Sequence, residues 1–271
     1  MTDPGIAFEI GSLTVRWYGL LICAGMALAG LIGYFEAKRQ HINVDEAINL
    51  VLIGLPSVII GARLYYVFMS WDYYSLHLNE ILHIWEGGLA IHGAIIAAII
   101  LAIIYCKVRK QDLWQWGDFA VPLAALGQGI GRWGNFFNQE AYGYPTDLPW
   151  AMYIDGAYRH PTFLYESIID IILFFVLFRI LRRPHKKGTV LCLYLIFYSA
   201  ARFFIESLRT DSLMVGSLRA AMLVSLIAIA AGIIILIIRR KEPIIDYDKL
   251  PEGVMTIDAP PKKAKKVKKN K

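Results

Sequence analysis

The segment FAVPLAALGQGIGRWGNFFNQE, residues 119–140, begins as an apolar run and ends around a fixed positive charge, Arg132. Its apolar part is typical of a membrane-spanning helix, where an arginine opposes insertion by about 2.5–3.5 kcal/mol. Arg63 and Arg202 lie in similar apolar surroundings. Because a guanidinium holds a phosphate through two parallel hydrogen bonds, these arginines indicate that an anionic head group is drawn in from the bilayer.

The rest of the chain is apolar in the same way. It has 271 residues, of which 57% are hydrophobic, and a mean hydropathy of +0.48. Soluble domains are markedly less apolar. Apolar runs near the length of a membrane-spanning helix occupy residues 17–36, 47–69, 89–106, 119–136, 162–181, 189–207 and 217–238. We therefore expect an all-α integral membrane protein with seven transmembrane helices.

Positive charge predicts the orientation of these helices. Lysine and arginine gather after the first, third, fifth and seventh runs. The positive-inside rule then places the N-terminus outside and the C-terminus in the cytoplasm. Residues 1–241 are expected to form one membrane domain, with 135–161 as a small extracytoplasmic cap. Residues 242–271 are expected to form a disordered, Lys-rich cytoplasmic tail lying on anionic lipid rather than on nucleic acid.

A polar stripe follows the helix that carries Arg132. Gln128, Arg132, Asn135 and Gln139 are spaced to share one face if the helix continues that far. Such a stripe faces the interior of a helix bundle. It indicates either an interhelical hydrogen-bond ladder or, because of the arginine, a functional site.

Two further groups are candidates for chemistry. Glu206 is spaced to pair with Arg202 or Arg209. The charges then either neutralise one another at the helix end or form a second phosphate clamp, in which Glu206 orients the arginine. His92 lies at the outer end of the third run. It is either an interior histidine whose hydrogen bonds are made within the protein, or a general base. The second role is chemically suitable because histidine titrates near neutrality.

Two carboxylates and a tyrosine near the outer face have either a structural or a catalytic role. Glu166 and Asp170 share a helix face, and local pairing of Glu166 with Arg63 or Arg202 is favoured slightly over direct chemistry. Tyr18 opens the first run and is equally typical of an interfacial anchor.

Cofactor chemistry has no support in the sequence. Cys23, Cys106 and Cys192 are scattered in or beside apolar runs and predict packing residues. The GxGxxG match at residues 129–134 lacks the preceding strand of a nucleotide-binding fold. We expect no metal site and no cofactor. Residues 1–17 lack the basic start of a cleaved signal peptide.

Residues 131–143, GRWGNFFNQEAYG, resemble the signature of the bacterial prolipoprotein diacylglyceryl transferases. The resemblance extends in family order to RWYG (16–19), GGLAIHG (87–93), HPTFLYE (160–166) and RFFIESLR (202–209). Two positions depart from the family pattern. Phe163 stands where many members have glutamine, which puts a hydrogen-bonding role there in doubt, and Ala94 stands where many have glycine.

The resemblance implies an activity in the bacterial cytoplasmic (inner) membrane, with the active site toward the extracytoplasmic side. A diacylglyceryl group moves from phosphatidylglycerol to the lipobox cysteine of a preprolipoprotein, a thioether forms and glycerol phosphate leaves. This is the first step of lipoprotein maturation, and we expect a monomeric enzyme. The alternative is a transporter or flippase that uses the same buried arginines to pass an anion or anionic lipid. The absence of an internal repeat counts against it.

The resemblance also implies site residues. The catalytic set is His92, Arg132, Arg202, Tyr18, Asn135 and Glu206. The phosphatidylglycerol-binding set is Arg132, Arg202, Asn138, Glu140, Gly143, Arg63, His160, Tyr165, Glu166 and Arg209.

Overall fold

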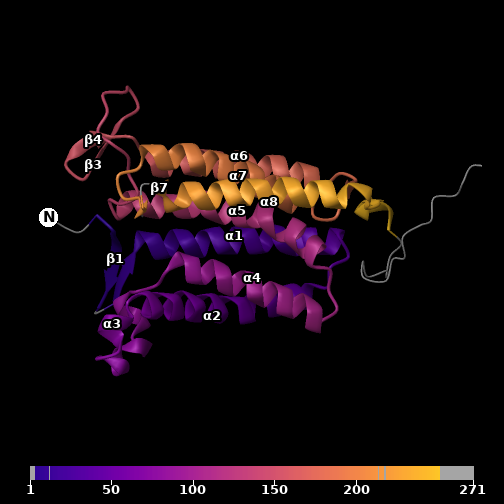
Figure 1. The fold of residues 1–271 in the computed structure, drawn as a ribbon, viewed down its shortest axis with the longest axis horizontal. Helices are drawn as coiled ribbons and strands as arrows, with labels where there is room; N and C mark the ends of the chain where they lie inside the picture. The colour runs from indigo at the N-terminus through magenta and orange to yellow at the C-terminus, as the bar shows by residue number, and fades with distance from the viewer. Residues whose placement is uncertain (1–3, 12, 213, 217, 251–271) are drawn as a thin grey trace, which may run out of the picture. The chain divides into compact units, whose positions relative to one another are not determined.

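The computed structural model describes residues 4–11, 13–212, 214–216 and 218–250. Within them the chain is mostly helical (Figure 1). The long helices are α1 (Trp17–Arg39), α2 (Val44–Met69), α4 (Ile91–Val108), α5 (Leu113–Phe137), α6 (Thr162–Leu181), α7 (Thr189–Leu208) and α8 (Ala220–Ile238). Each overlaps one predicted run, and α5 begins six residues earlier than predicted. Among the described residues, five helices are long and apolar enough to cross a membrane, namely α1, α2, α4, α7 and α8.

The chain divides into two compact units. The first unit comprises Met1–Arg39 and Trp114–Leu250, and the second contains Gln40–Leu113.

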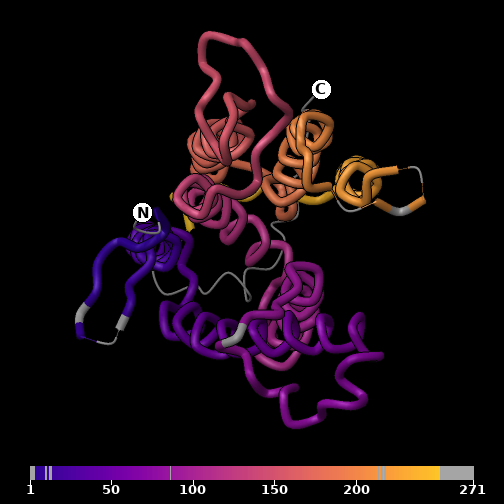
Figure 2. The backbone as a smooth tube through the Cα atoms, turned by 90° about the vertical axis from the view of Figure 1, so that its left-hand side faces the viewer, coloured from indigo at the N-terminus to yellow at the C-terminus, as the bar shows by residue number. Residues whose placement is uncertain are grey.

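Glycines allow close helix packing in the first unit. A Cβ on Gly25 of α1 would lie 3.4 Å from the Gly127 oxygen of α5. The Ser167 hydroxyl of α6 donates to the Gly129 carbonyl of α5 at 2.7 Å. Helices α6, α7 and α8 lie side by side in both views (Figures 1 and 2). Small residues let helices approach closely enough for such contacts. The buried core of this unit is formed by residues of α5, α6 and α7, namely Val121, Ala125, Leu126, Leu173, Phe174, Leu177, Leu181 and Val190.

Short antiparallel pairs connect the helices of the first unit. They join β1 (Ile6–Ile10) to β2 (Leu13–Arg16), β3 (Met152–Ile154) to β4 (Ala157–Arg159), β6 (Met214–Val215) to β7 (Leu218–Arg219), and β5 (His185–Lys186) to β8 (Ile244–Ile245). Asp155 and Gly156 turn β3 into β4 with φ of 49° and 79°, as a type I′ hairpin turn requires. The segment predicted as a cap, residues 135–161, therefore contains a small folded hairpin. It meets the end of α7 through the bridge between Gly143 and Arg209.

Part of the predicted disordered tail is folded. Strand β8 pairs with β5, and Tyr247 in the following short helix η4 (Tyr247–Lys249) is only 2% exposed. Arg39 at the end of α1 donates to Asp248 at 2.8 Å. The prediction of disorder from residue 242 is thus wrong up to Leu250, and residues 251–271 lie outside the described ones.

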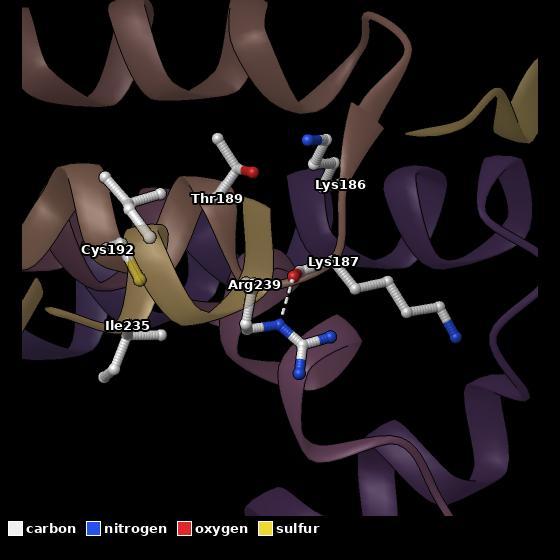
Figure 3. A pocket seen from close by; sticks show the side chains of 8 residues that line it. Lys186, Lys187, Thr189, Cys192, Ile235 and Arg239 are labelled. Carbon is white, nitrogen blue, oxygen red and sulfur yellow. Dashed lines mark hydrogen bonds between the residues drawn. The ribbon is translucent and has the colours of Figure 1, made fainter. Parts of the chain in front are cut away.

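A small pocket lies where β5 leads into α7. Its lining includes Lys186, Lys187, Thr189, Cys192, Ile235 and Arg239 (Figure 3). Arg239 Nε donates to the Lys187 carbonyl at 3.0 Å, and its guanidinium lies over the Trp114 ring. The volume, about 20 Å³, is enough for about one water molecule. This pocket is therefore too small to hold a lipid head group.

The second unit is built on the crossing of α2 and α4. A Cβ on Gly61 would lie 2.9 Å from the Gly93 oxygen, so the two glycines allow the backbones to touch. At the start of α2, Glu46 accepts hydrogen bonds from Arg109 Nε at 3.0 Å and the Tyr105 hydroxyl at 2.5 Å. In the sequence, α2 and α4 are connected by three short helices, α3 (Trp71–Tyr74), η1 (Leu78–Leu82) and η2 (Ile84–Glu86).

Candidate active site

Glu166 is the centre of a charged cluster in the first unit. It lies one turn into α6, and its side chain is 3% exposed. Its carboxylate pairs with Arg132 of α5 and Arg202 of α7, and Arg209 Nη1 approaches at 3.5 Å. Three helix ends are therefore joined through one buried carboxylate. Pairing with Arg202 was one predicted alternative, and the bond to Arg132 was not predicted.

Glu206 is the second carboxylate of the cluster. It contacts Arg202 Nη2 at 2.7 Å and lies 4.0 Å from Arg209 Nε. Glu206 was predicted to pair with Arg202 or Arg209, and the structure shows the close ion pair with Arg202. The side chains of Arg132 and Arg202 remain 23% and 18% exposed, so protein atoms do not fully cover either guanidinium group. We call Arg132, Arg202 and Arg209 the arginine cluster.

Asp211 completes the charges around Arg209. It accepts hydrogen bonds from Arg209 Nε at 2.9 Å and Nη2 at 2.6 Å. Burial acts to raise the pKa of Asp211, but the hydrogen bond and charge of Arg209 outweigh it and hold that pKa below its ordinary value. Asp211 is therefore ionised near neutral pH. Sequence reasoning missed it, although a carboxylate two residues from Arg209 was a visible signal.

The polar stripe on α5 is only partly as predicted. Gln128 accepts a hydrogen bond from the Tyr194 hydroxyl of α7 at 2.8 Å, which confirms an interhelical contact there. The stripe was predicted to include Gln139 only if the helix continued that far, and the helix ends at Phe137. Gln139 has a φ of 53°, and its side-chain oxygen accepts from the Asp155 amide at 2.9 Å. Its function is to hold the β3–β4 hairpin.

Two asparagines share one carboxylate just beyond Arg132. Glu140 Oε1 accepts from Asn135 Nδ2 at 2.9 Å and from Asn138 Nδ2 at 3.2 Å. The Glu140 amide also donates to the Asn135 carbonyl at 2.9 Å. Glu140 thereby folds the chain back onto the end of α5 and fixes both amide groups.

Gly143 and the start of α6 form a second polar group. The Gly143 amide donates to the His160 carbonyl at 2.9 Å, and a Cβ there would lie 2.7 Å from the Leu208 oxygen. Only glycine fits this close approach. The Tyr165 hydroxyl accepts from Trp150 Nε1 at 2.8 Å and lies 3.3 Å from His160 Nδ1. Trp150 was missed because it lies in an irregular segment.

Tyr18 lies directly on the backbone of α5. A Cβ added to Gly134 would overlap the Tyr18 ring, so the ring packs where only a glycine leaves room. The neighbouring Trp17 stacks on Phe137 with ring centroids 5.0 Å apart. These contacts fix the start of α1 against the last turn of α5, just beyond Arg132.

The second unit carries His92 and Arg63. His92 is the second residue of α4 and is exposed, with its ring 6.0 Å from that of Tyr65. Arg63 donates to the carbonyls of Glu80, Ile81, Gly87 and Gly88 at 2.7–3.1 Å. The structure therefore favours a structural role for Arg63, holding the α3–η2 segment, over the predicted phosphate-binding role.

Comparisons with known proteins identify a family and several relatives that this chain resembles. Residues 5–238 match the family described as prolipoprotein diacylglyceryl transferase. A phosphatidylglycerol–prolipoprotein diacylglyceryl transferase of Clostridium novyi is 48% identical over 242 residues, which cover 86% of this chain and 94% of that protein. A protein of the same name from Finegoldia magna is 46% identical, covering 90% and 98%. That of Thermosynechococcus vestitus is 45% identical, covering 85% and 90%.

Proposed function

Because this chain belongs to the prolipoprotein diacylglyceryl transferase family, we propose that it transfers the diacylglyceryl group of phosphatidylglycerol to the lipobox cysteine of preprolipoproteins. The arginine cluster is the observation that carries the proposal. Arg132 and Arg202 converge from two helices on one place and keep part of their surface exposed. This arrangement suits a lipid phosphate.

In this reaction the substrate thiol attacks the glyceryl carbon that bears the phosphate. A carbon–sulfur bond forms, the carbon–oxygen bond breaks, and glycerol phosphate leaves with the oxygen and its electron pair. A phosphate leaves readily only if its charge is stabilised, which is the role of Arg132 and Arg202. Glu206 holds Arg202 in place, and Arg209 lies near the carboxylates of Glu166 and Glu206.

His92 is proposed as the base that takes the thiol proton. A free thiol has a pKa of about 8.5, so only a small fraction is thiolate at neutral pH. A nearby imidazole raises that fraction. The exposed position of His92 in the first turn of α4 supports access to a peptide substrate.

The remaining site residues are proposed to shape the lipid site. Tyr18 and Asn135 lie on or beside the end of α5 that carries Arg132. The groups proposed to surround the lipid head group are Asn138, Glu140, Gly143, His160, Tyr165, Glu166 and Arg209.

We further propose that all seven long helices span the cytoplasmic membrane, with the N-terminus outside and the C-terminus in the cytoplasm. The positions of the lysine and arginine clusters support this orientation. Residues 1–241 then act as one monomeric catalytic domain, with the site and the 135–161 cap on the extracytoplasmic side. Cysteine accessibility at engineered positions in the β3–β4 turn and beyond Leu250 tests the orientation.

One assay tests the activity. Purified protein is incubated with phosphatidylglycerol and a lipobox peptide, and the expected product is the peptide with added diacylglyceryl mass. An unchanged peptide together with lipid movement across proteoliposomes would instead identify a flippase.

A further inference from the structure

Glu166 occupies the guanidinium groups that the proposed function assigns to the lipid phosphate. Its Oε2 pairs with Arg132 of α5, and its Oε1 pairs with Arg202 of α7. A carboxylate and a phosphate diester both offer two anionic oxygens to a guanidinium fork. The same nitrogen atoms can therefore hold either anion, but not both in the same geometry.

The charges of the cluster are already balanced without lipid. Its three arginines face three carboxylates, those of Glu166, Glu206 and Asp211. The buried Asp170, one turn further along α6 than Glu166, also lies close enough to interact with Arg132 and Arg202, so the cluster has no spare positive charge. Adding a phosphate while every carboxylate stays in place would introduce an excess negative charge beside side chains that are 3% exposed. Repulsion at such short range is strong away from bulk water. Phosphate binding therefore requires one carboxylate to move.

Glu166 is the carboxylate best placed to yield. Glu206 is on the same helix as Arg202, four residues away, so helix geometry keeps that pair together. Asp211 is two residues from Arg209 and bonds it through both oxygens. Glu166 alone of the three bridges guanidinium groups from α5 and α7, which is where a phosphate contacting both would sit.

We infer that Glu166 is an internal competitor for the phosphate, so that lipid binding at this site is the exchange of one anion for another. The inference rests on the proposed function. In the empty site Glu166 keeps Arg132 and Arg202 aligned, and on lipid entry its carboxylate gives up one or both of them. It thus acts as a positioning residue rather than as a catalytic one.

The exchange matters most for the departing product. Transfer converts a phosphodiester with one negative charge into glycerol phosphate, a monoester that gains a second charge above about pH 6. The arginine cluster attracts this dianionic product more strongly than it attracts the lipid phosphate. The product also has no acyl chains, so partition into the bilayer cannot draw it away from the site. Glu166 competes with the product for the guanidinium groups of Arg132 and Arg202. It thereby lowers the affinity of the site for glycerol phosphate and speeds the release of that product.

Glu166→Gln tests the inference because glutamine keeps the shape and removes the charge. The inhibition constant of glycerol 1-phosphate should fall about tenfold, equivalent to about 1.4 kcal/mol. The kcat should fall as product release slows, and the KM for phosphatidylglycerol should fall with it. An unchanged or higher inhibition constant overturns the inference, because a purely structural role for Glu166 gives weaker, not tighter, anion binding.

Two matched variants serve as controls. Glu206→Gln also removes a buried carboxylate of the cluster but leaves the Arg132 pair intact, so the inhibition constant should fall by less than about threefold. Glu46→Gln removes a buried carboxylate paired with Arg109 in the second unit and should leave the constant unchanged. An equal fall in all three variants contradicts exchange at Glu166.

A binding measurement separates this inference from the proposed function. Inorganic phosphate should raise the Tm of purified Glu166→Gln more than that of the wild-type protein, because phosphate replaces the missing anion. Equal shifts in an active wild type and in the variant overturn the inference alone. A larger shift in the variant, with no diacylglyceryl transfer by the wild type, overturns the proposed function alone.

The wild-type protein provides a test that does not depend on the stability of a variant. In a structure with bound glycerol 1-phosphate, the Glu166 carboxylate should have left Arg132, Arg202 or both. Phosphate bound to the arginine cluster while both Glu166 contacts persist overturns the inference.

Discussion

Arg63 in the second unit and Arg132 in the first look alike in the sequence, but the structure gives them opposite kinds of partner. Arg63 is 6% exposed and donates to four backbone carbonyls of one loop. Arg132 keeps 23% of its side chain exposed and pairs with Glu166 on another helix. Carbonyl partners cannot leave without unfolding the loop, whereas a carboxylate can be exchanged for another anion.

This difference shows that a buried arginine is not by itself evidence of a ligand site. The type of partner distinguishes a structural arginine from a ligand-binding one. Neutral carbonyl partners indicate that the guanidinium supports the fold, whereas anionic side-chain partners indicate a place that suits an anion. By this criterion the first unit holds the proposed phosphate site. The second unit holds a supported loop and the candidate base, His92.

The largest expected effect tests this division of roles. His92→Gln should lower kcat by about 10²–10⁴-fold, the usual contribution of a general base. Phosphatidylglycerol binding should persist, since the arginine cluster is untouched. Raising the pH should restore part of the activity, because more substrate thiol ionises without help. Rate–pH profiles and lipid binding to the purified variant measure these effects.

His77→Gln is the matched control for this substitution. His77 is an exposed histidine of the same unit that contacts Tyr73, so activity should stay near wild type. Loss of lipid binding in His92→Gln, without recovery at high pH, would place His92 in the lipid site and break the division between the units.

A somewhat smaller effect is expected at the arginine cluster. Arg132→Lys keeps the charge but loses the planar two-bond contact, so kcat/KM should fall about 10²–10³-fold. Transfer assays in membranes, with the amount of inserted protein matched, measure it. Arg182→Lys, an exposed arginine paired with Glu36, should change little. Near-wild-type turnover of Arg132→Lys would remove the phosphate role.

Arg63 should respond in stability rather than in chemistry. Arg63→Lys cannot reach all four carbonyls, and each buried group left unpaired costs about 1–3 kcal/mol. The Tm should fall, while the KM for phosphatidylglycerol should stay within a few-fold of wild type. A large rise in the KM for phosphatidylglycerol at an unchanged Tm would instead indicate that Arg63 binds the lipid. Arg63 and Arg132 would then have the same role.

The smallest effect is expected from the cysteines. Cys106 and Cys192 are buried and Cys23 is exposed in α1, all of them outside the arginine cluster. Replacing the three together with alanine should leave activity near wild type, because the reacting thiol belongs to the substrate. An inserted but inactive triple variant would indicate a covalent enzyme intermediate and weaken the direct-transfer chemistry assigned to both units.

Sequence patterns predicted the helices well because apolar runs and helix spacing are local properties. They also predicted the pairing of Glu206 with Arg202, which is four residues along one helix. They missed the early start of α5, where the buried Asp118 accepts from the backbone amides of Gly188 and Leu191 at the start of α7. They also missed the partners of Arg132 and Arg63, since contacts between distant helices or with loop carbonyls leave no local spacing.

The contact between Tyr18 and Gly134 has a consequence for how this family diversifies. A hydrogen atom is the only side chain that leaves room for the tyrosine ring, so the two positions form a single steric unit. Among relatives, a residue larger than glycine at position 134 should occur only together with a smaller one at position 18. Random mutagenesis should likewise recover Gly134→Ala only with a second change at Tyr18, so the change at Tyr18 has to come first.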